Sequence, residues 1–399
     1  MYLFTSESVS PGHPDKCADI IADTIVDRLL QLDPNARVAT EVFISGKHIM
    51  IGGEVKIDLP LDEDFYHLCV QDALTVIGYP EAGFSEEETL DPSTLNIEVF
   101  ISRQSPDISI GVDRKSGETG AGDQGMMIGY ACDETPQRMP SAIVWARVLR
   151  DALYDYALGH PERFGVDIKT QVSVDYGDHE GFVNGEVRGV ARIVAAVPHS
   201  ADLEIEEARA EIKEVIIRVL EREQIPFDRQ ETEFVINGTG RYVKHSPLAD
   251  SGLSGRKVVC DTYGAYAPIG GGSQSSKDYT KVDRSGLYAA RWIAKHIVAS
   301  GSAKKALVEI AYVIGRANPL HVTVDTQGTG KIDDTKLGEL ITEKFPLTPD
   351  WITKRFGLDT PSQQTFLYAD VAARGQVGIE GYPWERLDEE VLSWFRALS

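Results

Sequence analysis

A pattern of strand pairs and amphipathic helices occurs three times along the 399 residues, and it constrains the fold more than any other feature. In the predicted helices, apolar side chains recur every three or four residues. The predicted strand pairs are 37–44 with 48–55, 169–176 with 186–197, and 306–314 with 321–325. Each pair follows a predicted helix, at 18–29, 141–158 and 284–300. We therefore expect an α+β fold of three similar units, with helices on one face of each sheet.

The predicted domains are 1–108, 126–238 and 239–399, a number of domains that suits a chain of this length. Between the first two, the sequence GVDRKSGETGAGDQG at 111–125 has five glycines and almost no apolar residue. Long loops of this kind in compact domains usually serve function. We expect 109–125 to be a mobile active-site loop.

The charge of the chain excludes several classes of partner. With 62 acidic and 40 basic residues, the net charge of −22 argues against nucleic-acid and anionic-membrane binding. The sequence has no basic N-terminal segment followed by an apolar run, and no apolar stretch near the ~18 residues of a membrane span. Its four cysteines lie far apart, which is typical of buried thiols. We expect a cytoplasmic protein.

A glycine-rich basic segment stands out against this acidic background. Residues 270–283 read GGGSQSSKDYTKVD. Three glycines allow backbone N–H groups to approach a ligand closely, and lysines suit phosphate oxygens. Lys277 and Lys281 are four residues apart and would project the same way in a helix, while Asp283 is a candidate metal ligand. The segment is not a Walker A loop, because Asp278 replaces the Ser/Thr that binds magnesium.

A second segment offers similar chemistry at the predicted start of the first helix. Pro14 suits the first helical turn, and free N–H groups there favour anions. Lys16 is suited to phosphate, Asp15 to a metal, and His13 to a hydrogen bond with a departing oxygen. An ordinary helix cap with a solvated lysine is the alternative for this segment alone.

Further polar residues are candidates, each with an ordinary alternative. Arg256 and Lys257 lie where a loop is expected to enter a strand, so they either pair with Asp250 or protect a sheet edge. Asp167 and Lys169 flank a predicted strand and can form a simple surface ion pair. The last three candidates are the carboxylates of Glu41, Glu54 and Asp123. Their ordinary alternative is an exposed strand face for the glutamates and a turn for the aspartate.

These segments resemble the signature blocks of S-adenosylmethionine synthetases (methionine adenosyltransferases). The long matches are SESVSPGHPDKCAD at 6–19, GVDR and GAGDQG within 111–125, and GGGSQSSKD at 270–278. The shorter matches are INGTGR at 236–241, DSGLSGRK at 250–257, DTYG at 261–264, KVDRS at 281–285 and YPWE at 382–385. They occur in the family's order across nearly the whole chain.

The resemblance implies three α+β domains in a pseudo-threefold arrangement and active sites between the subunits of a homodimer or homotetramer. It implies that methionine sulfur displaces triphosphate from C5′ of ATP, and that the triphosphate is then hydrolysed to pyrophosphate and phosphate. A neutral thioether needs alignment and stabilisation of the leaving polyanion, which calls for many cations. The implied cofactors are two Mg²⁺ and one K⁺ per site.

By resemblance, the site residues divide by ligand. The catalytic residues are His13, Lys16, Lys169, Arg256 and Lys277. The ATP-binding residues are His13, Asp167, Lys169, Arg241, Tyr242, Asp250, Arg256, Lys257, Ser273 and Lys277. The methionine-binding residues are Glu54, Gln104, Asp123, Asp250 and Lys281. The metal ligands are Asp15 and Asp283 for Mg²⁺ and Glu41 for K⁺.

Some positions differ from the family pattern. Gln274 and Ser276 stand where phenylalanine and glycine are usual, Gly238 replaces a proline, and Ser251 replaces a common cysteine. The 115–119 stretch also differs from the common bacterial loop. These differences concern loop kinetics and fine substrate preference.

Two other functions fit the residue pattern alone. One is a generic ATP-dependent phosphotransferase or ligase. The other is a non-catalytic nucleotide-sensing subunit, which normally loses the histidine or metal-aspartate positions that His13, Asp15 and Asp283 fill here.

Overall fold

The structure is a computed structural model that describes residues 1–103 and 120–398. Its strands are β1 Leu3–Val9, β2 Arg37–Ser45, β3 His48–Lys56, β4 Asn96–Arg103, β5 Gly125–Cys132, β6 Lys169–Asp175, β7 Gly189–Ala196, β8 Glu233–Ile236, β9 Gly252–Leu253, β10 Lys305–Tyr312 and β11 His321–Asp325. Its α-helices are α1 Pro14–Leu32, α2 Glu63–Ile77, α4 Ser141–Gly159, α5 His179–Asn184, α6 Ile205–Arg222, α7 Val258–Asp261, α8 Val282–Ala299, α9 Asp334–Lys344, α10 Pro349–Phe356, α11 Tyr368–Arg374 and α12 Glu389–Leu398. Gln104 and most of the predicted 109–125 loop lie outside the described residues.

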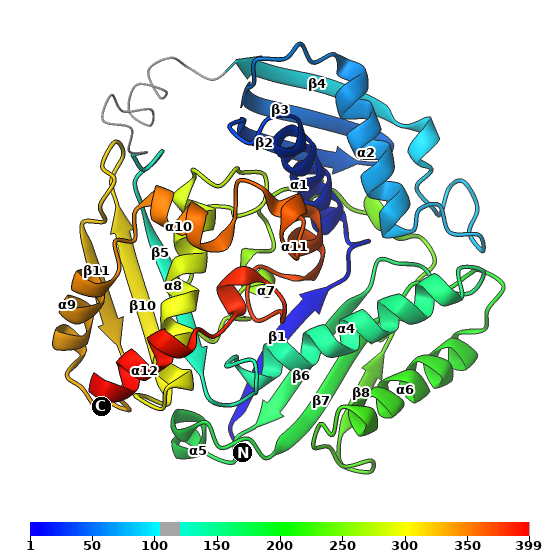
Figure 1. Cartoon of the computed structure of the whole chain (residues 1–399). Helices are drawn as coiled ribbons and strands as arrows, with labels where there is room; N and C mark the ends of the chain where they lie inside the picture. Colours follow the sequence, from blue (N-terminus) through cyan, green and yellow to red (C-terminus); the bar gives the residue numbers. More distant parts are fainter. Residues whose placement is uncertain (104–119, 399) are drawn as a thin grey trace.

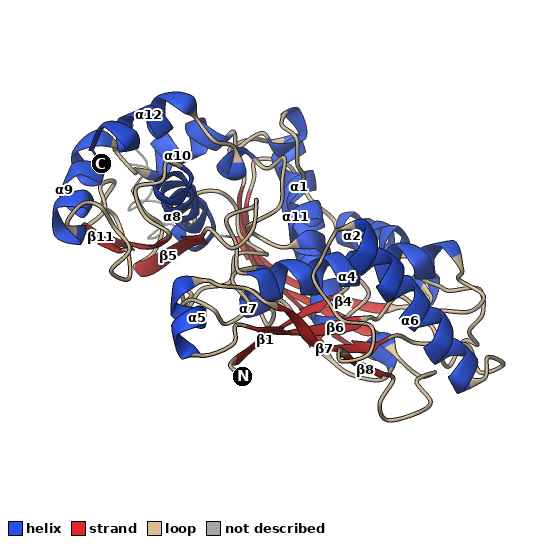
Figure 2. Ribbon diagram, turned by 90° about the horizontal axis from the view of Figure 1, so that it is seen from below, coloured by secondary structure: helices blue, strands red, loops and turns tan. Residues whose placement is uncertain are grey.

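Three sheets repeat one arrangement (Figure 1). In each, a long helix (α1, α4 or α8) is followed by an antiparallel hairpin, which is β2–β3, β6–β7 or β10–β11. A parallel strand extends two of the hairpins, β4 beside β3 and β8 beside β7. The long helix packs on its own sheet, and α4 and α6 lie on one side of β6 to β8 in Figure 2. The predicted α+β fold with a pseudo-threefold arrangement is confirmed.

Each sheet also contains a strand from another third of the chain. The N-terminal strand β1 pairs with β6, β5 pairs with β10, and the two-residue strand β9 pairs with β2. The first strand of every hairpin therefore lies between its own partner and an exchanged one. Because of this exchange, no third of the chain can separate without breaking a sheet. The domain boundaries expected from the sequence stay a prediction.

The apolar core has two parts. One part fills the space between the central sheet and helices α4 and α6. The larger part runs from α1 and α2 to α8 and the C-terminal helices, so it joins the first and third sheets. No helix in the described residues has the length and apolar character needed to cross a membrane. The four cysteines are free and buried.

Helix α1 connects the sheets through two different faces. Its predicted apolar face is confirmed, since Ala18, Ile21, Ile25 and Leu29 are fully buried. Another face carries four aspartates at intervals of four residues, which places them in one row along the helix. These are Asp15, Asp19, Asp23 and Asp27, and we call them the aspartate row.

Every member of the aspartate row is buried and holds a backbone segment from the C-terminal domain predicted at 239–399. Asp15 accepts a hydrogen bond from the N–H of Leu253, and Asp19 from that of Gly255. Asp23 accepts one from the N–H of Ser276. Asp27 accepts two, from the first residues of α11. Burial raises the pKa of Asp19 and that of Asp27 to about 7 each.

The YPWE segment at 382–385 forms a second buried ionic contact. Glu385 accepts hydrogen bonds from the Arg291 guanidinium at 2.9 and 3.0 Å and from the Lys295 ammonium at 2.8 Å. Its side chain is 1% exposed. Burial alone favours the neutral acid, but Arg291 and Lys295 lower the pKa of Glu385 to about 2. The carboxylate thus stays ionised inside the third domain.

We predict that Glu385→Gln lowers the free energy of unfolding by about 3–5 kcal/mol, because two buried cations lose their charged partner. Since the folded pKa lies below the usual 4.5, this stabilisation is complete above about pH 4.5 and is lost as the pH falls towards 2. Denaturant titrations at several pH values measure it. Glu389→Gln, which removes an exposed pair with Arg396, should cost less than about 1 kcal/mol. Equal losses in the two variants would contradict the assignment.

Candidate functional site

The N-terminus of α1 and the loop that follows β9 form the first part of the site. The Asp15 carboxylate lies 2.5 Å from the Lys257 ammonium and 3.5 Å from Nε of Arg256. Burial favours the neutral acid, but the hydrogen bonds from Lys257 and Leu253 hold the pKa of Asp15 below its usual value. A predicted metal ligand and two predicted phosphate ligands thus lie together. The alternative pairing of Arg256 or Lys257 with Asp250 is not seen, and they precede the short helix α7 rather than a strand.

The geometry around His13 defines which ring nitrogen carries the proton. The N–H of Asp15 donates to Nδ1 of His13 at 3.1 Å, so Nδ1 is unprotonated and Nε2 bears the hydrogen of the neutral ring. Burial, aided by the nearby Lys257 and Lys169, lowers the pKa of His13 to about 3. His13 is therefore a neutral hydrogen-bond donor through Nε2.

Lys16 is the most enclosed of the predicted phosphate ligands. Its ammonium lies 2.8 and 2.7 Å from the two carboxylate oxygens of Asp261 and 3.5 Å from Asp19. Burial opposes the charge, but Asp261 and Asp19 hold the pKa of Lys16 above its usual value. A phosphate would compete with these carboxylates for the ammonium. The partnership with Asp261 was not predicted, although Asp261 belongs to the DTYG block.

The glycine-rich segment forms the second part of the site. Lys277 lies 2.6 Å from the carboxylate of Asp283, and Gly272 adjoins the same carboxylate. An added Cβ at Gly272 would lie 2.2 Å from Cγ of Asp283, so only glycine permits this approach. The Lys281 ammonium lies 2.5 Å from Asp278. Lys277 and Lys281 do not share a helix, because Lys277 bridges to Ala39 at the edge of the first sheet.

Glu41 links the two parts. Its carboxylate accepts hydrogen bonds from the hydroxyl of Ser254, in the loop after β9, and from that of Ser276, in the glycine-rich segment. The Ser276 hydroxyl lies 3.3 Å away. Both segments therefore lie along strand β2, on the side opposite β3, and bring their cations there.

Asp167 forms the third part, at the start of β6. One carboxylate oxygen, Oδ2, accepts the N–H of Ser246 at 3.0 Å, whereas Oδ1 is buried without a hydrogen-bond partner. The Tyr242 hydroxyl donates to the backbone carbonyl of Asp167 at 3.2 Å. A buried carboxylate oxygen with no protein partner is costly, so Oδ1 is a candidate to accept a hydrogen bond from a ligand. Lys169, two residues further, is exposed.

The remaining predicted residues lie around these parts or outside the described chain. Glu54 on β3 is paired in register with Ala39, the residue that bridges to Lys277. Asp123 is exposed and accepts a hydrogen bond from the N–H of Gln124. Three other residues are exposed or partly exposed: Arg241, Asp250 and Ser273. The placement of Gln104 is outside the described residues, so its role stays a prediction.

The carboxylates of the site do not form a cage of protein ligands. Among the described residues, no three His, Cys, Asp or Glu side chains gather as a metal site. Asp15 and Asp283 instead stand singly, each ion-paired with a lysine. Single carboxylates fit Mg²⁺, which is commonly held by one or two carboxylates together with substrate phosphates.

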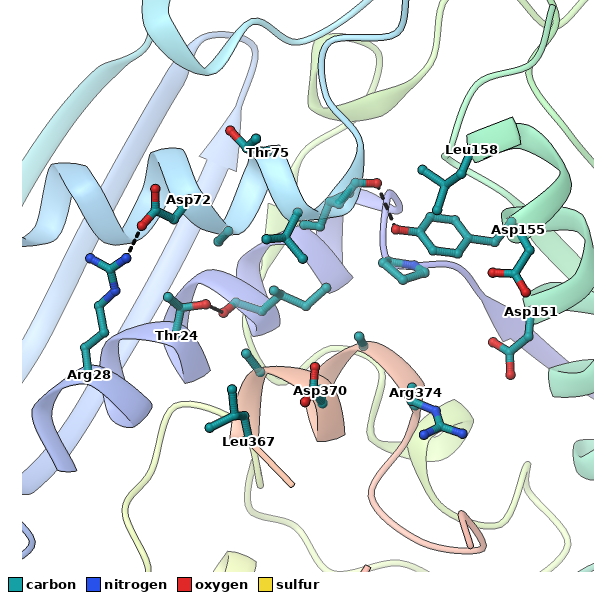
Figure 3. A pocket seen from close by; sticks show the side chains of 18 of the residues that line it. Thr24, Arg28, Asp72, Thr75, Asp151, Asp155, Leu158, Leu367, Asp370 and Arg374 are labelled. Atoms are coloured by element: carbon teal, nitrogen blue, oxygen red, sulfur yellow. Dashed lines mark hydrogen bonds and ion pairs between the residues drawn. The ribbon is translucent and has the colours of Figure 1, made fainter. Parts of the chain in front are cut away.

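A large cleft lies elsewhere on the molecule. It has a volume of about 910 Å³ and is lined by α1, α2, α4 and α11 (Figure 3). Its rim carries the Arg28–Asp72 ion pair at one end and Asp151 and Asp155 at the other. None of the predicted site residues lines it, so cleft size does not identify the site in this chain.

Comparisons with known proteins identify the family of the chain. Three family models match the chain, namely the N-terminal, central and C-terminal domains of S-adenosylmethionine synthetase at residues 1–106, 118–242 and 245–386. The chain belongs to the S-adenosylmethionine synthetase family. It makes S-adenosylmethionine from ATP and methionine, and the recognition from the sequence blocks is confirmed.

Full-length relatives support the same assignment. S-adenosylmethionine synthase 2 of Rhodospirillum rubrum is 40% identical over 394 residues, which cover 97% of this chain and 96% of the relative. The S-adenosylmethionine synthase of Nitratiruptor sp. is 41% identical over 399 residues, with the same coverage. A solved structure of an unusual S-adenosylmethionine synthetase from Campylobacter jejuni is 51% identical, covers both chains completely and superposes with a TM-score of 0.93.

Ser276, one of the expected departures from the family pattern, adopts a backbone conformation that favours glycine. Its φ is +81°, in the left-handed region that L-residues avoid. We predict that Ser276→Gly is more stable than Ser276→Ala by about 1 kcal/mol, because alanine keeps the strain. Thermal unfolding of both variants measures the difference. Equal stability would show that the strain is negligible.

Proposed function

We propose that this enzyme joins the methionine sulfur to C5′ of ATP with loss of the intact triphosphate, and then hydrolyses that triphosphate to pyrophosphate and phosphate. The observation that carries the proposal is that Arg256 and Lys257 pair with Asp15 close to the neutral His13, while Glu41 joins their loop to the glycine-rich segment in which Lys277 pairs with Asp283. Three segments far apart in the sequence supply these groups.

The chemistry explains why cations rather than a strong base are needed. A thioether is a neutral nucleophile, so no proton has to be removed from it. The leaving triphosphate carries the developing charge, and preorganised cations stabilise such charge in the transition state. His13 is placed to donate its Nε2–H to the departing oxygen, because it is neutral and its Nδ1 is already occupied.

Each ion pair of the site contains a carboxylate suited to Mg²⁺ and a lysine suited to a phosphate oxygen. Asp15 and Asp283 would hold two Mg²⁺, which neutralise the phosphates when bound, and each would release its lysine to a phosphate oxygen. This exchange preserves the count of charge pairs, which keeps the energetic cost small. Glu41 would bind K⁺, and its contacts with Ser254 and Ser276 place oxygen atoms around it.

The other roles follow from resemblance and location. Lys16, Lys169 and Arg256 are proposed to hold phosphates with Lys257 and Lys277. The other ATP contacts are assigned to Asp167, Arg241, Tyr242, Asp250 and Ser273, and methionine binding to Glu54, Gln104, Asp123, Asp250 and Lys281. A cytoplasmic location is part of the same proposal, since all four thiols are free.

Product analysis tests the proposed function. The protein is incubated with ATP, methionine, Mg²⁺ and K⁺, and the adenosylated sulfonium, pyrophosphate and phosphate are quantified. Equal amounts of all three products, formed only with methionine present, are expected. Phosphoryl or adenylyl transfer to methionine would instead indicate the phosphotransferase or ligase alternative.

We predict that His13→Asn slows formation of the sulfonium product by about 10²–10³-fold, the usual contribution of one preorganised hydrogen-bond donor to a developing negative charge, and changes ATP binding much less. Single-turnover assays and equilibrium binding separate the two effects. His179→Asn, at an exposed position on α5, is the matched control and should react normally. An unchanged single-turnover rate in the His13 variant would refute its role.

We further propose that the active enzyme is a homodimer or a dimer of dimers, with the sites between subunits. On the face of the first sheet away from α1, four large apolar side chains are 38–59% exposed: Phe43, Met50, Phe100 and Leu253. Met50 and Leu253 flank Phe43 in register, so they share one face. Glu41 lies on the same face, two residues before Phe43. A second copy covering this face would therefore border the site.

Phe43→Asp is predicted to shift the protein towards the monomer and to reduce activity at the same protein concentrations, because a charge on the apolar face opposes its burial. Sedimentation equilibrium and activity at matched concentrations measure both effects. Val76 on α2 is 79% exposed, so Val76→Asp serves as the control. Unchanged association of the Phe43 variant would place the interface elsewhere.

A further inference from the structure

A buried histidine and a buried glutamate lie behind Asp167, and the proposed reaction does not use them. Nε2 of His245 is 2.9 Å from Oε1 of Glu81, and the two side chains are 0% and 1% exposed. They lie 164 residues apart in sequence. Glu81 follows the end of α2, whereas His245 precedes a short 3₁₀ turn at Ser246–Leu248.

The contacts of the ring show that His245 is charged. Nδ1 lies 2.8 Å from the carbonyl oxygen of Val243, and Nε2 faces the Glu81 carboxylate. The carbonyl oxygen and an ionised carboxylate can only accept, so in this ion pair both nitrogens carry hydrogens. Burial opposes this charge, but the hydrogen bond to Glu81 holds the pKa of His245 above its usual value.

Another buried histidine shows that burial itself does not produce the charge. Nδ1 of His296 lies 2.8 Å from the carbonyl of Trp292, but its Nε2 accepts the N–H of Asp388. One nitrogen donates and the other accepts, so the ring is neutral. Burial lowers the pKa of His296 to about 4.

Glu81 makes contacts suited to an ionised carboxylate. Besides His245, its Oε1 accepts the N–H of Val166 at 3.0 Å, and its Oε2 accepts the hydroxyl of Thr89. The Thr89 oxygen in turn accepts the N–H of Glu81, which leaves the hydroxyl hydrogen for the carboxylate. Three donors therefore surround the carboxylate, and the pair is a satisfied buried ion pair.

The pair fixes both segments that hold Asp167. Val166, bound to Glu81, directly precedes Asp167, while Ser246, whose N–H binds Oδ2 of Asp167, directly follows His245. Gly165 packs against the imidazole so closely that an added Cβ would lie 2.7 Å from Nε2. Burial raises the pKa of Asp167, and the positive charges of His245 and Lys169 oppose that rise.

We propose that Glu81 and His245 are positioning residues for the nucleotide, which fix Asp167 so that its unpaired Oδ1 can bind a ribose hydroxyl of ATP. This rests on the proposed contact of Asp167 with the ribose. Neither Glu81 nor His245 touches the reacting atoms in this assignment. Their effect is on recognition of the sugar.

The test compares kcat/KM for ATP, 2′-deoxy-ATP and 3′-deoxy-ATP. The native enzyme is expected to prefer ATP to at least one analogue. Asp167→Asn, Glu81→Gln and His245→Gln should each reduce that preference about tenfold, since hydrogen bonds to charged groups contribute to this extent. His296→Gln, at an equally buried histidine outside the site, should lose stability but keep the preference.

The outcomes separate this inference from the proposed function. If native enzyme uses all three nucleotides equally, or Asp167→Asn keeps the preference, the ribose contact itself is wrong and the inference fails with it. If Asp167→Asn loses the preference while the other two variants keep it, only the positioning role is overturned. Should the single variants not fold, Glu81→Met combined with His245→Phe removes both charges without leaving one unpaired. The ratio of kcat/KM for ATP to that for the deoxy analogues is then measured in this double variant, and an unchanged ratio would overturn the positioning role.

Discussion

The site depends most on the aspartate row of α1, the four carboxylates at 15, 19, 23 and 27. Each accepts backbone N–H groups from the C-terminal domain predicted at 239–399, so one helix positions the loop after β9, the glycine-rich segment and the start of α11. Carboxylates this deeply buried are stable only when hydrogen-bonded. The loops that carry Arg256, Lys257 and Lys277 therefore cannot leave α1 without exposing unsatisfied groups. The aspartate row therefore joins α1 of the first domain to the loops of the third domain that carry the proposed phosphate ligands.

Much of this fold can be predicted from local sequence patterns. The apolar period of α1, the turn between β2 and β3, and Gly301 at the end of α8 each predict their element correctly, because each acts within a few residues. The exchanged strands are different. Strand β9 has only two residues, and β1 and β5 pair with strands far along the chain. No local sequence pattern identifies such strand partners, so the sequence predicts three units that are more independent than those in the structure.

The same distinction holds for the site. The signature blocks identified the cations and carboxylates, but not the contacts among them. The sequence did not indicate that Asp261 encloses Lys16 or that Asp15 pairs with Lys257. Nor did it connect Glu81 with His245, which belong to no block that the resemblance used. These contacts depend on how α1, α2 and the loop around 245 pack, which only the folded chain defines.

In the proposed site, cations from distant segments surround one triphosphate beside His13. A crystal structure of the protein with a non-hydrolysable ATP analogue, Mg²⁺ and methionine tests it most directly. We expect phosphate oxygens within hydrogen-bond distance of Lys257 and Lys277, with the carboxylates of Asp15 and Asp283 on the metal ions. A triphosphate bound away from these lysines, for example in the cleft of Figure 3, would show that they do not form the triphosphate site.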